Sequence, residues 1–399
     1  MPGDASPRIL HVSGDYPDAV DPAKTPVIHT LLQLTGKAFD HRVISINRRS
    51  PRALAFVGST LSGRGRPRLV VERTCSGEPE SWIYRAPARG LYHHTMLEQL
   101  GDTIAASMSH DPPDLFVGHK LTIEGIAVAR AAERLGRPYA LTLQGGTDTK
   151  IVQARPDLRS LLRRMYHGAR MVVAFAPWTV EAVENRLGRR QGATHIIPCP
   201  TENDAIREPD PSGQDVISVF HLHGYRNKNL ASLVEAARIN RESGTDIPMA
   251  VIGGGAAEDV AAVRRFIGDA RAITMEGALA RDDMGPRMNR AACLAVPSHS
   301  ESFGLVFVEA LLAGCPVIYP RDRAIAGYFD NAPFAVAVDP GDAGALAHAI
   351  RDMAARQSTI KESLARWQRS ADAMRFTRPA IGRAYADALY AALGDGECA

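Results

Sequence analysis

The sequence of 399 residues has little cysteine, little net charge and no long apolar run. Its five cysteines are odd in number and form no CxxC pair, which argues against a disulfide framework and against a cysteine-built zinc site. We expect Cys293 and Cys315, which stand in apolar runs, to be buried thiols. A net charge of +3 argues against a nucleic-acid-binding protein. Because no apolar stretch reaches about 18 residues, we expect no membrane-spanning helix.

The N-terminal sequence MPGDASPRIL lacks the apolar core of a signal peptide, so we expect a cytoplasmic protein. Hydrophobic residues make up 45% of the chain and charged residues 23%, as is typical of globular proteins. At about 150 residues per domain, this length predicts two or three domains.

Short apolar runs alternate with helical patterns in the first half of the chain. Such alternation predicts βαβ units and a mostly parallel sheet covered on both faces. The predicted strands are 8–13, 42–47, 69–73, 115–119, 139–144, 171–175 and 195–198, and the predicted helices are 26–38, 91–108, 123–136, 157–167 and 178–187.

The same alternation restarts after a polar stretch with four prolines, residues 198–215, which we interpret as an interdomain linker. The tail from about residue 358 is helical and alanine-rich. The predicted strands here are 216–222, 249–252, 272–276, 293–297, 316–319 and 334–338, and the predicted helices are 228–242, 257–268, 281–290, 303–314 and 342–355.

This pattern predicts an α/β protein with two Rossmann-like, doubly wound parallel-sheet domains facing a cleft. We place the first domain at residues 1–205, the second at 206–375, and a C-terminal helix at 376–399 that packs back on the first domain. Ligands of such sheets bind outside the carboxyl ends of the strands.

The segment 297–318, PSHSESFGLVFVEALLAGCPVI, contains two glutamates eight residues apart. If the helix begins near Phe303, Glu301 and Glu309 lie about 12 Å apart along its axis and about 80° apart around it. Carboxylates at this separation can each accept hydrogen bonds from vicinal hydroxyl groups. The alternative is a helix-capping Glu301 and a surface Glu309. An otherwise apolar run around Glu309 argues for a buried carboxylate that needs a partner.

Backbone amides at the start of this helix would favour a phosphate. Glycine allows close approach of a ligand to the backbone. The amides concerned belong to Ser302, Phe303 and Gly304.

Three other strand ends carry weaker signals. The loop after 216–222 contains Arg226 and Lys228, cations that suit a pyrophosphate, although a solvated basic turn is the common alternative. The glycines of IGGG at 253–255 and the turn at 276–278 also follow strands, and the alternative for the glycines is a tight turn.

The segment ESFGLVFVEALLAGCPVI resembles the Glu-x7-Glu signature of retaining glycosyltransferases of the GT-B fold, glycosyltransferase family 4 (glycosyl transferases group 1). The order of the KN loop, the GGG turn, the EGAL turn and the glutamate pair matches the family over most of the second domain. In the first domain, HVSGDYPD and the stretch from LFVGHK to TLQGGTD are similar but less specific.

The resemblance implies a role for each matching residue. Glu309 would bind the ribose hydroxyls of a nucleotide, and Glu301 would contact the hydroxyls of the donor sugar. Lys228 would neutralise the leaving diphosphate. Other donor-binding positions, largely through their backbone, would be Ser302, Phe303, Gly304, Leu305, Gly253, Gly254, Gly255, Glu276, Gly277 and Ala278.

Several positions depart from the family pattern. His223 replaces the usual arginine five residues before the lysine and stays on the donor side, where Arg226 could supply the missing charge. Gln144 replaces a histidine near the reacting sugar, and His119 is a neighbouring catalytic candidate or a satisfied strand-end histidine. In place of a glycine pair after the first strand, Lys24 and Thr25 could face the cleft.

The first domain is expected to bind the acceptor, a glycan, a lipid-linked group or a small molecule. His93 and His94 are acceptor-side candidates, although helix-face histidines are usually surface residues. The loop 47–68 carries Arg48, Arg49, Arg52, Arg64, Arg66 and Arg68, which suits an anionic membrane surface or equally a solvated loop.

The implied reaction is the retaining transfer of a sugar from a nucleotide diphosphate sugar, for which we expect a UDP-sugar, with no other cofactor. No DxD triplet is present, so we expect no metal-held diphosphate. Same-face attack, in which a phosphate oxygen takes the acceptor proton, suits the residues better than a carboxylate pair. The alternatives are a catalytically impaired nucleotide-sugar-binding protein and, less well supported, a sugar-nucleotide 2-epimerase.

Overall fold

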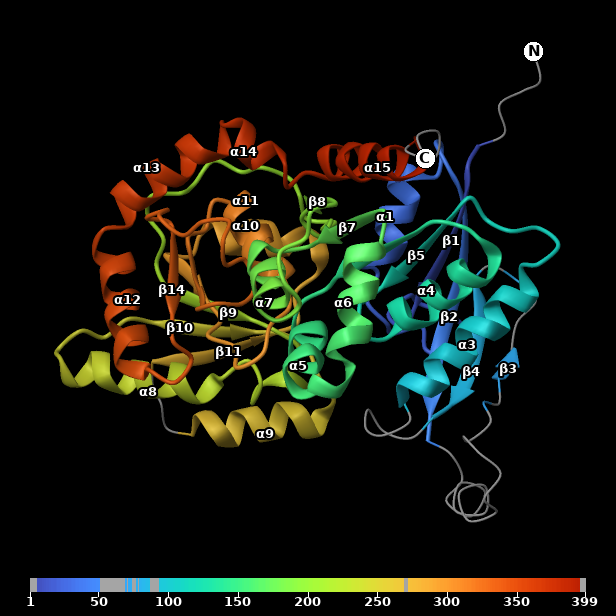
Figure 1. Ribbon diagram of the computed structural model, residues 1–399. Helices are drawn as coiled ribbons and strands as arrows, with labels where there is room; N and C mark the ends of the chain where they lie inside the picture. The colour runs from blue at the N-terminus through green and yellow to red at the C-terminus, as the bar shows by residue number, and fades with distance from the viewer. Residues whose placement is uncertain are drawn as a thin grey trace. The chain divides into compact units, whose positions relative to one another are not determined.

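The computed structural model describes residues 6–50, 69, 71–73, 77, 79–86, 93–268 and 272–394. The chain forms two compact units (Figure 1). Unit 1 contains the chain up to Phe175, Thr179–Pro198 and the stretch from Ile381, whereas unit 2 contains Ala176–Trp178 and Cys199–Ala380.

Unit 1 is built on an eight-stranded sheet with the order β3-β4-β2-β1-β5-β6-β7-β8. Its strands are parallel except for β3, which pairs antiparallel with β4. Without β3 the strands run in the Rossmann order, extended by one strand at the far edge. The strands are β1 (Arg8–Ser13), β2 (Asp40–Arg49), β3 (Val71–Arg73), β4 (Glu80–Arg85), β5 (Leu115–His119), β6 (Tyr139–Leu143), β7 (Met171–Ala174) and β8 (Ala193–Ile196).

Helices connect these strands, and α3 packs on α4. They are α1 (Val27–Thr35), α3 (His93–Ser107), α4 (Glu124–Leu135), α5 (Gly146–Ala154), α6 (Arg159–Gly168) and α7 (Pro177–Leu187), with a 3-10 turn at Pro156–Leu158.

Unit 2 contains a six-stranded parallel sheet with the order β11-β10-β9-β12-β13-β14, which is the Rossmann order 3-2-1-4-5-6. Its strands are β9 (Val216–Val219), β10 (Met249–Ile252), β11 (Ile273–Gly277), β12 (Cys293–Ala295), β13 (Val317–Pro320) and β14 (Ala335–Val338). Its helices are α8 (Leu230–Glu242), α9 (Ala257–Ile267), α10 (Arg281–Asn289), α11 (Leu305–Leu312), α12 (Ala343–Ala355), α13 (Gln357–Gln368) and α14 (Ala371–Met374), with a 3-10 turn at Leu222–Gly224.

The predicted class of fold is confirmed, because both sheets are parallel apart from β3 and both are doubly wound. Strands such as β5 and β13 are buried along their whole length, which is why they stand out as apolar runs. The sequence analysis missed β4, which has a charged residue at each end, and α5, which has little amphipathic character. Cys293 and Cys315 are buried free thiols, as predicted.

The stretch 198–215 is not a loose linker. The units divide at Pro198, and residues from Cys199 belong to unit 2. Thr201 is buried, and the backbone N–H of Arg207 donates to the carbonyl of Leu312 at 2.8 Å. The polar composition of the stretch therefore reflects an irregular segment that packs along unit 2.

The C-terminal helix α15 (Arg378–Gly394) belongs to unit 1 from Ile381 onward. The ring of Tyr390 lies 4.5 Å from that of Phe39, centroid to centroid. A Cβ atom at Gly382 would lie 3.1 Å from Cβ of Leu34, so the helix approaches α1 closely there (Figure 1). No helix in the described part of the chain has the length and apolar character needed to cross a membrane.

Lys361, which is 2% exposed, ties α13 to two other segments of unit 2. Its Nζ donates to the carbonyls of Ala291, at 2.8 Å, and Asp210. We expect Lys361→Met to lower the free energy of unfolding by about 2–3 kcal/mol, because buried carbonyls lose their donor. The exposed Lys37→Met is the control and should stay within about 0.5 kcal/mol in urea unfolding. Equal stability of the two variants would contradict this role for Lys361.

Candidate functional site

The strand order of unit 2 reverses between β9 and β12, which are neighbours in the sheet. In doubly wound sheets, ligands bind outside the carboxyl ends of the strands at this point. The loop after β9 carries Lys228 and the loop after β12 carries Glu301. Two of the predicted residues therefore meet where the fold offers a ligand site.

Lys228 and Glu301 form an ion pair with 2.5 Å between Nζ and Oε2. Their side chains are only 24% and 14% exposed. The hydroxyl of the buried Ser298 lies 3.4 Å from the same carboxylate oxygen. An ammonium group has three hydrogens, so a lysine paired with one carboxylate can still donate to an anionic ligand.

Backbone contacts hold the two loops together around this pair. Asn229 is 2% exposed and has a left-handed backbone with φ of 60°. Its Nδ2 donates to the carbonyls of Pro297 and Pro340, at 3.0 and 2.8 Å. Asn227 donates through Nδ2 to the carbonyl of Ser300 at 2.9 Å. These hydrogen bonds fix the backbone positions from which the Lys228 and Glu301 side chains extend.

The helix expected to begin near Phe303 begins instead at Leu305. Gly304 precedes it with φ of 73°, and a Cβ atom there would lie 2.6 Å from the ring of Phe307. A left-handed backbone and a crowded ring therefore both require glycine. Glu301 lies outside the helix, so the helical estimate of its separation from Glu309 does not apply.

The amides at this turn differ in their surroundings. Ser302 is exposed, Phe303 is buried, and Leu305 is the first residue of α11, whose first turn contains no acidic residue. The start of α11 is therefore open to an anion.

Glu309 lies in α11 and faces the segment after β8. The Thr201 hydroxyl donates to Oε1 of Glu309. Burial raises the pKa of Glu309, and hydrogen bonds from the Thr201 and Asn203 side chains oppose this shift. The carboxylate is therefore partnered inside unit 2 and is not a surface residue. The sequence analysis missed Thr201 and Asn203 because it interpreted their segment as a linker.

The glycine triplet brings β9 and β10 together. A Cβ atom at Gly253 would lie 1.8 Å from the carbonyl oxygen of Phe220, which no side chain allows. The N–H of Leu222 donates to the carbonyl of Gly254 at 2.8 Å. A Cβ atom at Gly255 would lie 3.0 Å from Cβ of Leu222. The tight approach of two strand ends thus accounts for the glycines.

The turn at 276–278 is anchored by its backbone and by one ion pair. The N–H of Gly253 donates to the carbonyl of Gly277 at 2.8 Å. The Glu276 carboxylate accepts from Nη2 of Arg287 at 2.7 Å, and these hydrogen bonds lower its pKa. Ala278 is exposed. The Glu276 side chain and the Gly277 carbonyl are therefore both engaged within unit 2.

Arg226 and His223 are exposed on the loop after β9. Nε of Arg226 donates to the hydroxyl of Tyr225 at 3.0 Å. Nδ1 of His223 lies 3.2 Å from Oδ1 of Asp259, and its side chain is 83% exposed. Within the described part of the chain, neither side chain forms a hydrogen bond or an ion pair with Lys228 or Glu301.

In unit 1, Gln144 and His119 are linked through Thr142. The Thr142 hydroxyl lies 3.4 Å from both Nε2 of Gln144 and Nδ1 of His119. Nε2 of His119 lies 3.0 Å from Nδ1 of His11, whose Nε2 lies 2.9 Å from Nδ1 of His41. Burial lowers the pKa of His119 to about 3, so this imidazole is neutral.

The other acceptor-side candidates are separated. Nζ of Lys24 donates to Oδ2 of Asp18 at 3.0 Å and to Oγ of Ser45 at 2.9 Å, whereas Thr25 is exposed. His93 is buried against Tyr84, and His94 follows it at the start of α3. Arg48 and Arg49 end β2, whereas Arg52, Arg64, Arg66 and Arg68 lie outside the described residues.

The sequence analysis overlooked a charged cluster after β5. Nζ of Lys120 lies 2.5 Å from Oδ2 of Asp15 and 3.9 Å from Oε1 of Glu124. The same Glu124 oxygen accepts from the N–H of Gly14 at 2.6 Å. The signal was the sequence GHKLTIEG, in which two charged residues follow a buried strand.

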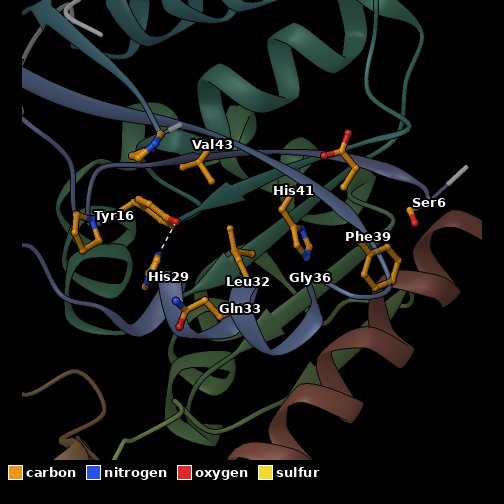
Figure 2. A pocket seen from close by; sticks show the side chains of 12 residues that line it. Ser6, Tyr16, His29, Leu32, Gln33, Gly36, Phe39, His41 and Val43 are labelled. Atoms are coloured by element: carbon orange, nitrogen blue, oxygen red, sulfur yellow. Dashed lines mark hydrogen bonds between the residues drawn. The ribbon is translucent and has the colours of Figure 1, made fainter. Parts of the chain in front are cut away.

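A cavity of about 680 Å³ lies elsewhere in unit 1 (Figure 2). Tyr16, His29, Phe39 and His41 line it, and the Tyr16 hydroxyl lies 2.8 Å from Nδ1 of His29. None of the predicted site residues lines this cavity. The described residues also contain no group of three or more potential metal ligands.

The raised pKa of Glu124 predicts how the free energy of unfolding depends on pH. Burial raises its pKa from 4.5 to about 7, so between these values the folded protein retains a proton that the unfolded chain has lost. The free energy of unfolding should therefore fall as pH rises through this window, by up to about 3 kcal/mol. Glu124→Gln keeps an oxygen for Gly14 but cannot titrate. Urea unfolding at pH 5 and pH 7.5 measures the effect. Between these two pH values the wild type should lose more stability than Glu124→Gln. An equal change in the free energy of unfolding of both proteins would contradict the assignment.

The requirement for glycine at position 304 can be tested by its effect on stability. Gly304→Ala should lower the free energy of unfolding by about 1–3 kcal/mol, because it places a side chain at positive φ against Phe307. Gly344→Ala, in the first turn of α12, is the matched control and should change stability by less than about 0.5 kcal/mol. Thermal unfolding of both variants measures the difference, and similar values would contradict the requirement for glycine.

Residues 202–374 match the family model described as Glycosyl transferases group 1, and residues 33–200 match the one described as Glycosyl transferase 4-like domain. The D-inositol 3-phosphate glycosyltransferase of Mycobacterium sp. (strain KMS) is 34% identical over 118 residues, which cover 28% of this chain and 27% of the relative. That of Mycolicibacterium gilvum (strain PYR-GCK) is 36% identical over 118 residues, 30% of this chain and 23% of the relative. The match therefore spans about a quarter of these curated relatives.

Two solved structures are similar over nearly their whole length. Sucrose-phosphate synthase from Thermosynechococcus elongatus has a TM-score of 0.66 and 19% identity, covering 96% of this chain and 98% of that one. Anabaena HepE in complex with UDP has a TM-score of 0.62 and 14% identity, covering 96% and 99%. At these identities the likeness shows the fold. With both halves matched by the two models, the chain belongs to the group 1, or family 4, glycosyltransferases of the GT-B fold.

Proposed function

We propose that this glycosyltransferase moves a sugar, with retention of anomeric configuration, from a nucleotide diphosphate sugar to an acceptor hydroxyl in the synthesis of a glycan, glycolipid or other glycoconjugate. The observation that carries the proposal is the Lys228–Glu301 ion pair at the point where the strand order of unit 2 reverses.

The donor diphosphate would lie against the loops after β9 and β12. Neither α8 nor α11 has an acidic residue in its first turn, so the helix starts favour an anion. Lys228 supplies the compensating charge, and the backbones of Gly304 and Leu305 allow close approach.

The two glutamates would bind opposite parts of the donor. Glu309, oriented by Thr201, would accept hydrogen bonds from the ribose hydroxyls. Glu301 would accept them from the sugar once the diphosphate draws Lys228 toward itself. A similar fold, that of Anabaena HepE, was determined with UDP, and we propose a UDP-sugar donor.

In the reaction, the bond between the anomeric carbon and the phosphate oxygen breaks. A bond from the acceptor oxygen to the same face of that carbon forms, and the acceptor proton passes to the leaving phosphate oxygen. Charge grows on the diphosphate as the bond breaks, so the Lys228 ammonium and the helix-start amides stabilise the transition state. Of the two catalytic candidates in unit 1, only the half-buried Gln144 is accessible to a ligand, because His119 is 0% exposed and its ring nitrogens face His11 and Thr142. We propose that no metal is required.

The second candidate function is nucleotide-sugar binding without catalysis. His223 and Gln144 favour it, because they replace residues usual in the family, and the His223 side chain is exposed beside Asp259. Slow hydrolysis of a bound donor in the absence of acceptor would distinguish an enzyme from such a protein.

We expect Lys228→Ala to lower kcat for turnover of the UDP-sugar by about 100-fold, the usual scale for losing one donor to a developing anion. Arg238→Ala is the matched control. Arg238 lies on α8 and pairs with the surface residues Glu235 and Glu242, so its loss should change turnover less than twofold. Release of UDP measures the rates, and NMR of the product should show the anomeric configuration of the donor.

Turnover of Lys228→Ala within a few fold of the control would contradict the electrostatic role of Lys228. A product of inverted configuration would contradict the proposed same-face attack.

A further inference from the structure

The strand order of unit 1 reverses between β1 and β5, so the carboxyl ends of these strands are the place where a doubly wound sheet offers a ligand site. Lys120 and Asp15 meet there, with 2.5 Å between Nζ and Oδ2. The Asp15 side chain is 33% exposed and that of Lys120 is 10% exposed. Asp15 is therefore the most accessible member of this cluster, and Lys120 lies directly against it.

Two features of the cluster have no structural explanation of their own. Oε2 of Glu124 is buried and has no hydrogen-bond partner among the described residues, although the side chain is only 1% exposed. Lys120 has φ of 127°, which is costly for a residue with a side chain. Unpartnered buried polar groups and strained backbone conformations are concentrated at functional sites.

Helix starts at this edge of the sheet are already filled by carboxylates of the protein. Glu124 opens α4 and takes the N–H of Gly14, the first residue after β1. Asp148, in the first turn of α5, takes the N–H and hydroxyl of Thr122 at 2.9 and 2.8 Å. The start of α1 lacks an acidic residue, but the loop before it carries Asp15 and Asp18. Carboxylates of the protein thus occupy two backbone donors at this edge, the N–H groups of Gly14 and Thr122.

The charges here also oppose an anion. Burial lowers the pKa of Lys120, but the carboxyl groups of Glu124, Asp15 and Asp148 outweigh burial and raise the pKa above its usual value. Lys24, in the loop before α1, is paired with Asp18. In unit 2, by contrast, Lys228 has one carboxylate partner, and the two helix starts beside it have no acidic residue.

We propose that Asp15 and Lys120 bind the acceptor, and that this acceptor presents an uncharged polyhydroxy group to them rather than a phosphate ester. The inference rests on the proposed function and adds a substrate class to it. A carboxylate and an ammonium group side by side accept from and donate to neighbouring hydroxyls of a sugar or polyol. Glu124 acts as a positioning residue that holds Gly14 and Lys120.

The test compares neutral acceptors with their phosphate esters. With one UDP-sugar donor, transfer is measured to glucose, mannose and myo-inositol, and to glucose 6-phosphate, mannose 6-phosphate and myo-inositol 1-phosphate. We expect transfer to a neutral member with kcat/KM at least tenfold above that for its ester. Asp15→Asn should raise KM for the neutral acceptor about tenfold and reduce the ratio of kcat/KM between the neutral acceptor and its ester. The Kd for UDP, measured by calorimetry, should not change.

Asp111→Asn is the control, because Asp111 pairs with Arg8 and Arg42 on the surface of unit 1. Preferential transfer to a phosphate ester, transfer to no neutral member, or equal KM values for Asp15→Asn and Asp111→Asn would overturn the inference. Failure of the proposed function is a separate result, because the wild-type protein would then neither bind UDP nor turn over a UDP-sugar.

Discussion

The ion pair between Lys228 and Glu301 is the interaction on which the proposed donor site depends. It joins two loops that are 73 residues apart in the sequence, at the one place where the strand order of unit 2 reverses. Asn229 and Asn227 fix the loops through backbone carbonyls, so the two charges are held before any ligand arrives. Such preorganisation is what electrostatic stabilisation of a leaving group requires, because little reorganisation remains for the reaction itself.

The two units use the same fold in opposite electrostatic ways. Unit 2 leaves the starts of α8 and α11 free of acidic residues and places a lysine beside them. Unit 1 fills the starts of α4 and α5 with Glu124 and Asp148, and surrounds its lysine with carboxylates. This contrast is the basis for proposing a diphosphate at the sheet edge of unit 2 and a neutral ligand at that of unit 1. This division of roles would keep two substrates of different charge at their own sites.

Fully buried parallel strands could be predicted from the sequence, because burial on both faces produces continuous apolar runs. The predicted separation of Glu301 and Glu309 along one helix was wrong, because Glu301 lies before the start of α11. Strand β4 and the helix start at Leu305 could not be predicted, since β4 has charged residues at both ends and the helix start depends on how Gly304 packs against Phe307. Thr201 was missed because a polar, proline-rich sequence does not distinguish a flexible linker from an irregular segment that packs along a domain. Lys120 and Glu124 become a cluster only when β1 and β5 pair.

A crystal structure of the protein with bound UDP tests the central claim most directly. The account predicts the diphosphate at the carboxyl ends of β9 and β12, with Nζ of Lys228 within hydrogen-bond distance of a phosphate oxygen and the Glu309 carboxylate on the ribose hydroxyls. UDP bound elsewhere in the protein, or at this place with Lys228 turned away from the phosphates, would contradict it.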